Sequence, residues 1–257
     1  MSIIYINPYR FAAAAAYDPD AQSYITAVEA ADGQALEVGV KDAINAFVVG
    51  CKADGIWAAI KAACIMAGAR TLAGALVPLV GTAPTNFNFV AGDYDRKTGL
   101  KGDGSSKYLD SNRNNNADPQ NNQHIAFYSP DYNSAAPVIA SNDAGSVNGM
   151  SLLTSGNARS RTSTNTLYTS TDPFIAMSRA SAAAFNVRYN GSTVSSSVAS
   201  EAPTSRPILV YRLKNFAGND VYSASRLAFY SIGESLDLAL LDARVTALVN
   251  AIGAAIP

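Results

Sequence analysis

From Thr71 onward the chain is a succession of short apolar runs separated by Gly, Pro, Asn and Ser, and this pattern narrows the possible folds most. Short apolar runs bounded by turn residues are typical of strands, and many such strands favour an antiparallel sandwich over a sheet built from strand–helix–strand units. The segment Tyr189-Asn190-Gly191-Ser192 is the strongest hairpin signal, because Asn and Gly tolerate positive φ at both central turn positions. The predicted strands are residues 75–80, 107–109, 125–129, 137–140, 152–154, 174–178, 185–189, 208–213 and 227–230.

The first 70 residues carry helical signals instead, after an extended arm predicted for residues 1–9. Asp18 suits the N-cap of a first helix with Pro19 at its first position, and Gly33 ends that helix. A third helix is predicted for residues 54–64. Between them, a second helix is predicted from apolar residues at helical spacing: Leu36, Val40, Ile44, Phe47 and Val48.

The C-terminus carries one more helical signal, for which Ser235 is the predicted cap. We therefore predict two parts: an N-terminal arm and helical docking segment at residues 1–70, and a β-sandwich with a C-terminal helix at residues 71–257. The apolar residues at helical spacing in the last helix are Leu236, Leu240, Ala243, Ala247, Leu248 and Ile252.

The charge content limits the classes of partner. Charged residues make up 15% of the chain, against about 25% in an ordinary globular protein. With 19 Lys+Arg against 20 Asp+Glu and no basic cluster, nucleic acid is not expected as a partner. Lys61, Arg70 and Pro78 interrupt the apolar region 56–80, so we predict no membrane span there. Low charge combined with 48% hydrophobic residues favours a homo-oligomer, although a large monomeric sandwich can share that composition.

The two cysteines, Cys51 and Cys64, lie in an Ala-rich stretch with no histidine close in sequence. We predict buried free thiols, because cysteine is among the most buried residue types. A disulfide is the minority alternative.

The sequence contains no recognisable set of catalytic residues. His124 is the single histidine, and no Gly-x-Ser-x-Gly motif accompanies it, so we interpret it as structural. Glycoside hydrolysis requires two carboxylates in one cleft, and Asp93 and Asp95 have a suitable spacing on a strand. Their neighbours Gly92 and Arg96 to Gly99 indicate a turn, so we predict a solvated loop with a local charge partner rather than a catalytic pair.

A binding function requires fewer residues. A sugar site needs an aromatic platform and a few polar groups on loops, and the loops predicted at residues 110–122 and 192–205 would lie at the tips of the sandwich. The predicted binding residues are Tyr108, Asn112, Arg113 and Asn114, with Tyr128 and Tyr132 as further aromatic candidates. Oxygen ligands for calcium also occur here, but turn chemistry explains them equally well, and no metal or cofactor is predicted. These oxygen-bearing residues are Asp103, Asp110, Asn112, Asn114 and Asp118.

Three segments have a recognisable pattern: residues 101–110 (KGDGSSKYLD), 125–129 (IAFYS) and 227–236 (LAFYSIGESL). Together they resemble LamG-like, concanavalin A-type jelly rolls found in structural proteins of phages and prophages. Residues 53–57 (ADGIW) with Lys61 resemble the helical lead-in that precedes such jelly rolls. The resemblance covers the chain from about Ala53 to its end. It implies a jelly-roll sandwich, but the fold hosts lectins, glycan-cleaving enzymes and structural modules alike.

The leading hypothesis is a non-enzymatic structural protein of the phage virion, either tail- or fibre-associated or decorating the capsid. It would assemble through its N-terminal arm and helices with copies of itself and with other particle proteins. The alternative is a lectin-like module that binds a host glycan or receptor. A polysaccharide-degrading enzyme is a third hypothesis. Acidic residues alternating along a strand, which similar glycan-cleaving proteins carry, are missing from the predicted strands.

Overall fold

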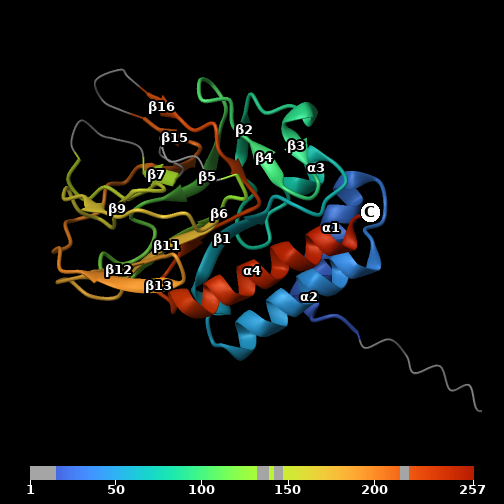
Figure 1. Cartoon of the computed structure of the whole chain (residues 1–257), viewed down its shortest axis with the longest axis horizontal. Coiled ribbons are helices and arrows are strands. Elements are labelled where there is room, and N and C mark those ends of the chain that lie inside the picture. The colour runs from blue at the N-terminus through green and yellow to red at the C-terminus, as the bar shows by residue number, and fades with distance from the viewer. Residues whose placement is uncertain (1–15, 132–138, 142–146, 215–219) are drawn as a thin grey trace, which may run out of the picture.

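The computed structural model describes residues 16–131, 139–141, 147–214 and 220–257. In this part of the chain, helices pack on one side of two antiparallel sheets (Figure 1). The predicted fold class, a mainly β antiparallel jelly-roll sandwich with N-terminal helices and a C-terminal helix, is confirmed. The arm predicted for residues 1–9 lies outside the described residues.

The first two helices follow the sequence signals closely. Helix α1 spans Pro19–Asp32, and the Asp18 carboxylate at its N-cap accepts a hydrogen bond from the Asp20 amide at 3.0 Å. The helix ends at Gly33, whose φ of 65° is left-handed and suits glycine. Helix α2 spans Val38–Ala53, slightly later than the apolar pattern that began at Leu36.

The third helix predicted for residues 54–64 is wrong. Gly55, with a φ of 72°, turns the chain after α2, and only the short η1 (Trp57–Ala59) is helical. Strand β1 (Ile60–Ile65) follows and pairs with β18 (Phe229–Gly233). A strand covered on both faces is apolar on both faces, so its sequence lacks the two-residue alternation that would distinguish it from a helix.

The described strands form a six-stranded sheet, a seven-stranded sheet and two smaller sheets. The six-stranded sheet has the order β1, β18, β6 (Gln123–Tyr128), β11 (Phe174–Arg179), β12 (Phe185–Tyr189) and β13 (Ser192–Ser196). The seven-stranded sheet has the order β10 (Thr166–Leu167), β9 (Asn157–Arg159), β8 (Leu152–Leu153), β7 (Ile139–Ser141), β14 (Pro207–Val210), β5 (Tyr108–Asn114) and β2 (Thr85–Phe87). Smaller sheets pair β15 (Arg212–Leu213) with β16 (Val221–Tyr222), and β17 (Arg226–Leu227) with β4 (Gly99–Lys101) and β3 (Tyr94–Asp95).

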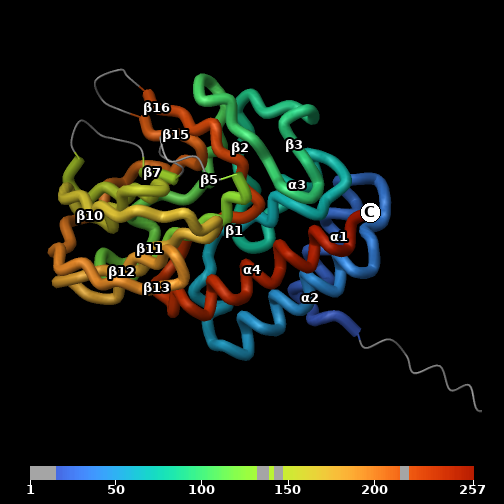
Figure 2. Tube along the Cα trace, in the orientation of Figure 1, coloured from blue at the N-terminus to red at the C-terminus, as the bar shows by residue number. Residues whose placement is uncertain are grey.

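The observed backbone differs from two of the predicted strands. Residues 75–80 do not form a strand: α3 (Leu72–Ala75) ends there, and Val80 alone bridges to Ala63 of β1. Residues 208–213 are divided between β14 and β15, because Tyr211 adopts a φ of 70° that breaks the extended chain. Figure 2 shows the β15–β16 hairpin on the side of the molecule away from the helices.

Strand β6 shows how the layers are built. Its Ile125 and Phe127 belong to the core between the two sheets, whereas Ala126 and Tyr128 belong to the core between the six-stranded sheet and the helices. Every residue of β6 is buried because both faces of the strand are covered. The six-stranded sheet is therefore the middle of three layers.

The last helix, α4, spans Leu238–Ala255 and runs antiparallel to α2. Glycines allow the close approach, since a side chain at Gly39 would meet Ala255 and one at Gly50 would meet Arg244. The cap predicted at Ser235 is wrong. Asp237 accepts from the Ala239 and Leu240 amides, while the Ser235 hydroxyl donates to Asn122 at 2.7 Å.

Among the described helices, α4 is the one that is long and apolar enough, by length and composition, to cross a bilayer. About two fifths of it (39%) is buried inside the protein, and core helices of soluble proteins have the same length and composition. Arg188 and Arg244 hold it in place through ion pairs with Asp242 and Asp54, each at 2.7 Å.

The hairpin between β12 and β13 is confirmed, with Tyr189 paired to Ser192 and positive φ at Asn190 (49°) and Gly191 (69°). We expect Gly191→Ala to lower the free energy of unfolding by about 1 kcal/mol, because no atom lies near the added Cβ and only the left-handed backbone opposes it. Gly253→Ala in α4 also meets no neighbour and should raise stability by about 0.5–1 kcal/mol. Urea unfolding of both variants checks this, and shifts of equal sign would contradict it.

Candidate functional site

Tyr108 lies in strand β5, as predicted, whereas Asn112, Arg113 and Asn114 lie in the same strand and not in the predicted loop. The Arg113 guanidinium forms an ion pair with Asp118. Asn112 has a left-handed backbone with a φ of 54°. Its side-chain amide donates to the Ala83 carbonyl at 2.7 Å and to the Thr85 hydroxyl. Asn114 is exposed beside Pro207. Internal contacts thus occupy Asn112 and Arg113, and the binding role of these four residues stays a prediction.

Tyr108, the predicted aromatic platform, is also engaged. Its ring stacks on Phe87 with centroids 4.3 Å apart and planes 3° apart. The Arg212 guanidinium carbon lies 4.4 Å from the same centroid. Two groups this close cannot share one face of the ring, so Phe87 and Arg212 cover opposite faces. Of the other two aromatic candidates, Tyr128 is buried and Tyr132 lies outside the described residues.

His124 is a core residue of β6. Its Nδ1 donates to the Glu234 carbonyl at 2.6 Å, and its Nε2 accepts from the Ser231 hydroxyl at 3.0 Å. Burial lowers the pKa of His124 to about 4, and the nearby charge of Arg113 lowers it slightly further. The hydrogen bond to the Glu234 carbonyl acts in the opposite direction but is the weaker effect. A fully buried imidazole with both nitrogens engaged has no room to act on a ligand.

The carboxylates with glycosidase-like spacing stabilise a turn. Asp93, at the end of η2 (Ala91–Asp93), accepts from Lys107 Nζ at 2.5 Å and from the Val90 amide at 2.8 Å. Asp95 accepts from the hydroxyl and amide of Thr98, and these bonds lower the pKa of Asp95. Each carboxylate thus serves its own loop, and they do not form an acid and nucleophile across one cleft.

The oxygen-rich segment predicted as a possible calcium loop has internal partners as well. Asp103 accepts from the backbone amides of Ser105, Ser106 and Lys107, and these bonds overcome burial and hold the pKa of Asp103 well below its usual range. Among the described residues, no group of three or more His, Cys, Asp or Glu side chains could hold a metal ion.

Both cysteines are buried free thiols, as predicted. Cys51 lies in α2, but Cys64 lies in β1 and contacts the Tyr230 hydroxyl at 3.5 Å. Burial raises the pKa of each thiol to about 12. Neither thiol is therefore an accessible nucleophile.

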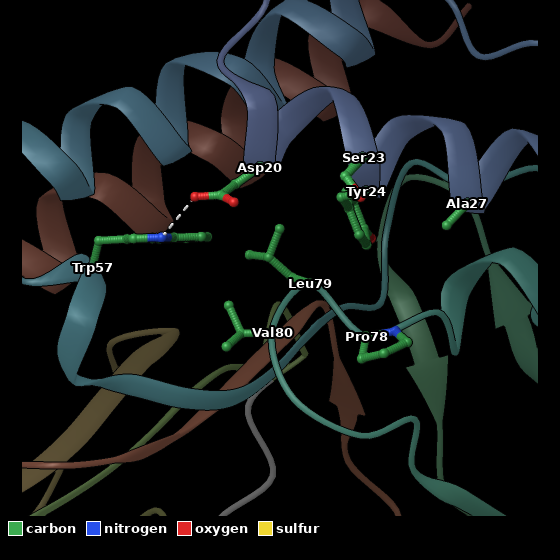
Figure 3. A pocket seen from close by; sticks show the side chains of 8 residues that line it. All are labelled: Asp20, Ser23, Tyr24, Ala27, Trp57, Pro78, Leu79 and Val80. Atoms are coloured by element: carbon green, nitrogen blue, oxygen red, sulfur yellow. Dashed lines mark hydrogen bonds between the residues drawn. The ribbon is translucent and has the colours of Figure 1, made fainter.

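An open pocket lies between α1, η1 and the segment that follows α3, with a volume of about 280 Å³ (Figure 3). We call it the Trp57 pocket. Four α1 residues three, one and three positions apart form one wall, because that spacing places them on one helix face. The lining residues are Asp20, Ser23, Tyr24 and Ala27 of α1, Trp57 of η1, and Pro78, Leu79 and Val80.

Trp57 is fixed at the edge of this pocket by charged neighbours. Its Nε1 donates to Asp20 Oδ2 at 3.1 Å. Lys52 Nζ lies 2.6 Å from the same oxygen, 2.6 Å from Asp18 Oδ1 and 5.8 Å from the centroid of the Trp57 ring. The hydrogen bond from Lys52 lowers the pKa of Asp18, and those to Asp18 and Asp20 raise the pKa of Lys52. The pocket therefore has a fixed aromatic side, an apolar wall and a polar edge.

The sequence prediction did not identify this pocket. Trp57 was assigned to a helix, and its neighbours in the pocket come from segments far apart in the chain. The available signal was the single tryptophan of the chain together with a run of polar and aromatic residues on one face of α1.

A second surface feature is formed by the paired helices, which lie side by side in Figure 1. We call it the α2–α4 surface. Its largest apolar members are Val38, Val49 and Leu240, with 66%, 45% and 37% of their area exposed. Its charged groups have partners within the chain: Asp42 accepts from Tyr17 at 2.8 Å, and Arg244, whose side chain is 38% exposed beside Gly50, forms an ion pair with Asp54. Its exposed residues are Val38, Gly39, Asp42, Ala46, Val49 and Ala53 of α2, and Ala239, Leu240, Ala243, Ala247, Asn250, Ala251 and Ala254 of α4.

No family model and no curated protein matches this sequence. Among solved structures, domain 4 of AbnA, a GH43 extracellular arabinanase from Geobacillus stearothermophilus in complex with arabinotriose, is similar over 63% of this chain and 82% of its own, at 11% identity and a TM-score of 0.39. A mutant Trypanosoma rangeli sialidase displaying trans-sialidase activity is similar over 84% of this chain and 40% of its own, at 10% identity and a TM-score of 0.41. Similarity at this level carries no inference about what this chain binds or does.

Proposed function

We propose that this chain is a non-enzymatic structural component of a phage particle, which associates with copies of itself through the α2–α4 surface. The α2–α4 surface carries the proposal. A helix of 18 residues is about 27 Å long, and two helices of about 10 Å diameter side by side cover about 500 Å². This projected area lies within the range of about 300–600 Å² for the largest apolar patch of a monomeric protein, and such patches are often functional.

A second copy of the chain fits this surface for two reasons. The surface is largely apolar, and its charged groups, Asp42 and the Arg244–Asp54 ion pair, already have partners within the chain, so two copies can face each other at little electrostatic cost. Two patches of about 500 Å² bury about 1,000 Å² together, which reaches the lower limit for a specific interface. The α2–α4 surface is therefore the proposed contact between copies in the predicted homo-oligomer.

Two of the three segments behind the phage resemblance are neighbours in the six-stranded sheet. Residues 125–128 of β6 pair with residues 229–232 of β18. Lys61, from the lead-in segment, forms an ion pair with Glu234 at 3.3 Å. The lead-in segment and two of the three segments are therefore in contact in the folded chain.

The non-enzymatic part of the proposal rests on the described ionisable groups. His124 is buried, Asp93 and Asp95 hold turns, and both thiols are buried. None of these side chains faces the Trp57 pocket.

We expect light scattering coupled to size exclusion to give a discrete oligomer for the natural chain and a monomer for the double variant Val49→Asp/Leu240→Asp. Charges placed in the contact would have to be buried without partners, which strongly disfavours association. Leu167→Asp is the matched control, since Leu167 is 75% exposed on β10, away from the helices. A natural chain that is monomeric at all concentrations, or a double variant with unchanged mass, would contradict the contact.

The particle assignment has its own measurement. Mass spectrometry of density-purified particles from the encoding phage or prophage should detect the chain at a fixed ratio to the major capsid protein. Its absence from particles, with the protein present in the lysate, would overturn the structural role even if the oligomer forms.

A further inference from the structure

The Trp57 pocket has polar groups that the fold itself does not use. Trp57 and Lys52 both contact Asp20 Oδ2, which leaves Asp20 Oδ1 without a partner among the described residues. Ser23 is exposed, and its hydroxyl has no partner in the described part of the chain either. In Figure 3 both side chains extend from α1 on the side that also bears Tyr24. A hydrogen-bonding edge therefore borders an aromatic and apolar surface.

The pocket is largely preformed. Leu79 and Val80 are tied to β1, because the Leu79 amide donates to the Ala63 carbonyl at 2.8 Å and the Ala63 amide donates to the Val80 carbonyl at 3.0 Å. On the opposite side, Lys52 and Asp20 hold the Trp57 ring. A ligand would pay little ordering entropy on entering such a site.

The charges around the pocket select against ionic ligands. The Lys52 ammonium already occupies the position over the Trp57 ring that a ligand cation would take, and it would repel a second cation. An anion, including any nucleotide phosphate, would meet the carboxylates of Asp18 and Asp20. A long acyl chain requires an enclosed apolar tunnel, whereas this pocket is open and has a polar edge.

We propose that the Trp57 pocket binds one neutral sugar residue of a glycan. The apolar face of the sugar ring packs against Trp57 and the Pro78–Val80 wall, and its hydroxyl groups form hydrogen bonds with Asp20 and Ser23. The volume of about 280 Å³ lies near the lower limit of small-molecule sites, which suits a single ring with the rest of the glycan in solvent. This site is distinct from the predicted residues of β5, and it is independent of the α2–α4 contact.

The single tryptophan makes the test direct, because the intrinsic tryptophan fluorescence of the full chain reports on this pocket alone. We expect titration with at least one of glucose, galactose, mannose and N-acetylglucosamine to change the emission saturably. Ser23→Ala removes one hydrogen bond from an exposed side chain and should weaken that binding about fivefold. Gln22→Ala, on the neighbouring position of α1 but outside the pocket, should leave it unchanged.

Isothermal titration calorimetry on Trp57→Ala completes the test, with loss of all measurable sugar binding as the expected result. Sugar binding that persists in Trp57→Ala would place the site elsewhere and overturn the proposal. No saturable change with any of the four sugars, or a change produced by choline and not by sugars, would overturn it as well. Ser23 lies outside the α2–α4 surface, so Ser23→Ala should leave the mass in solution unchanged, and failure here is distinguishable from failure of the structural role.

Discussion

Replacing Arg179 by methionine is expected to lower the free energy of unfolding by about 3 kcal/mol, because a buried guanidinium that joins several backbone carbonyls is lost and the buried Ser160 carbonyl loses this donor. Arg179 is fully buried at the end of β11. Its guanidinium donates to the carbonyls of Ser160 at 2.8 Å and Val198 at 3.1 Å, and to those of Ser181, Ala182 and Ala184. Methionine fills a similar volume but cannot donate to any of these oxygens. The Ala182 carbonyl keeps the Ser200 amide as a donor and the Ala184 carbonyl keeps the Ser181 hydroxyl, so the Ser160 carbonyl is affected most.

The same side chain also joins separate parts of the sandwich. Ser160 follows β9 in the seven-stranded sheet, residues 181–184 form the turn into β12, and Val198 follows β13. Its guanidinium carbon lies 5.1 Å from the Phe185 ring. Loss of Arg179 should therefore loosen one end of both sheets together.

Urea unfolding followed by circular dichroism measures the loss, with Arg206→Met as the control, since Arg206 is exposed. Arg179→Lys should be intermediate, because an ammonium group supplies three donors where the guanidinium supplies five. Equal midpoints for Arg179→Met and Arg206→Met would show that the carbonyls find other partners and that the arginine is not structural.

Local signals in the sequence predicted those features of the fold that depend on neighbouring residues. Asp18, Pro19 and Gly33 bound α1 as expected, and the Asn190-Gly191 turn forms because its two residues accept positive φ. Such features need no knowledge of the rest of the chain. The sandwich itself followed from the number of short strands.

Features that depend on tertiary contacts were predicted less well. The residues of β1 are apolar on both faces because a sheet neighbour and two cores surround them, which the spacing of apolar residues cannot distinguish from a helix. Ser235 and Asp237 are both good caps in isolation, and the hydrogen bond of Ser235 to Asn122 decides between them.

The candidate site shows the same limit. Tyr108 and Arg113 have suitable chemistry for a ligand, but the sequence does not reveal that Phe87, Arg212 and Asp118 already contact them. The Trp57 pocket needs three segments that meet only in the folded chain. At β5 and at the Trp57 pocket, the sequence thus indicated which side chains have suitable chemistry for a ligand. It could not show which of them the folded chain leaves free to contact one.

Lowering the pH from 6.5 to 4 is expected to remove about 3 kcal/mol of stability through His124 alone, because 2.5 pKa units separate the ordinary value of 6.5 from the folded value of about 4. The sign follows from burial. The unfolded chain binds the proton at about pH 6.5, whereas the folded chain holds the imidazole neutral until about pH 4. Stability from His124 is therefore complete above pH 6.5, falls as the pH drops to 4, and changes no further below that.

Few other groups interfere in this window. His124 is the single histidine of the chain, and the carboxylates whose pKa the fold lowers act at lower pH. Glu37, held by Arg96, begins to lose its contribution only below its ordinary pKa of 4.5. A measured slope between pH 5 and 6.5 can therefore be assigned to one imidazole.

Urea midpoints measured from pH 7 to 4.5 for the natural chain and for His124→Gln provide the test. The glutamine side chain cannot titrate, so the midpoint of this variant should change little between pH 6.5 and 5, where the carboxylates of both proteins contribute little, even though its stability at pH 7 is lower. The natural chain should lose stability steadily below pH 6.5. If both proteins show the same slope, His124 is not held neutral by the fold, and the packing of β6 between the two cores would have to admit water beside the imidazole.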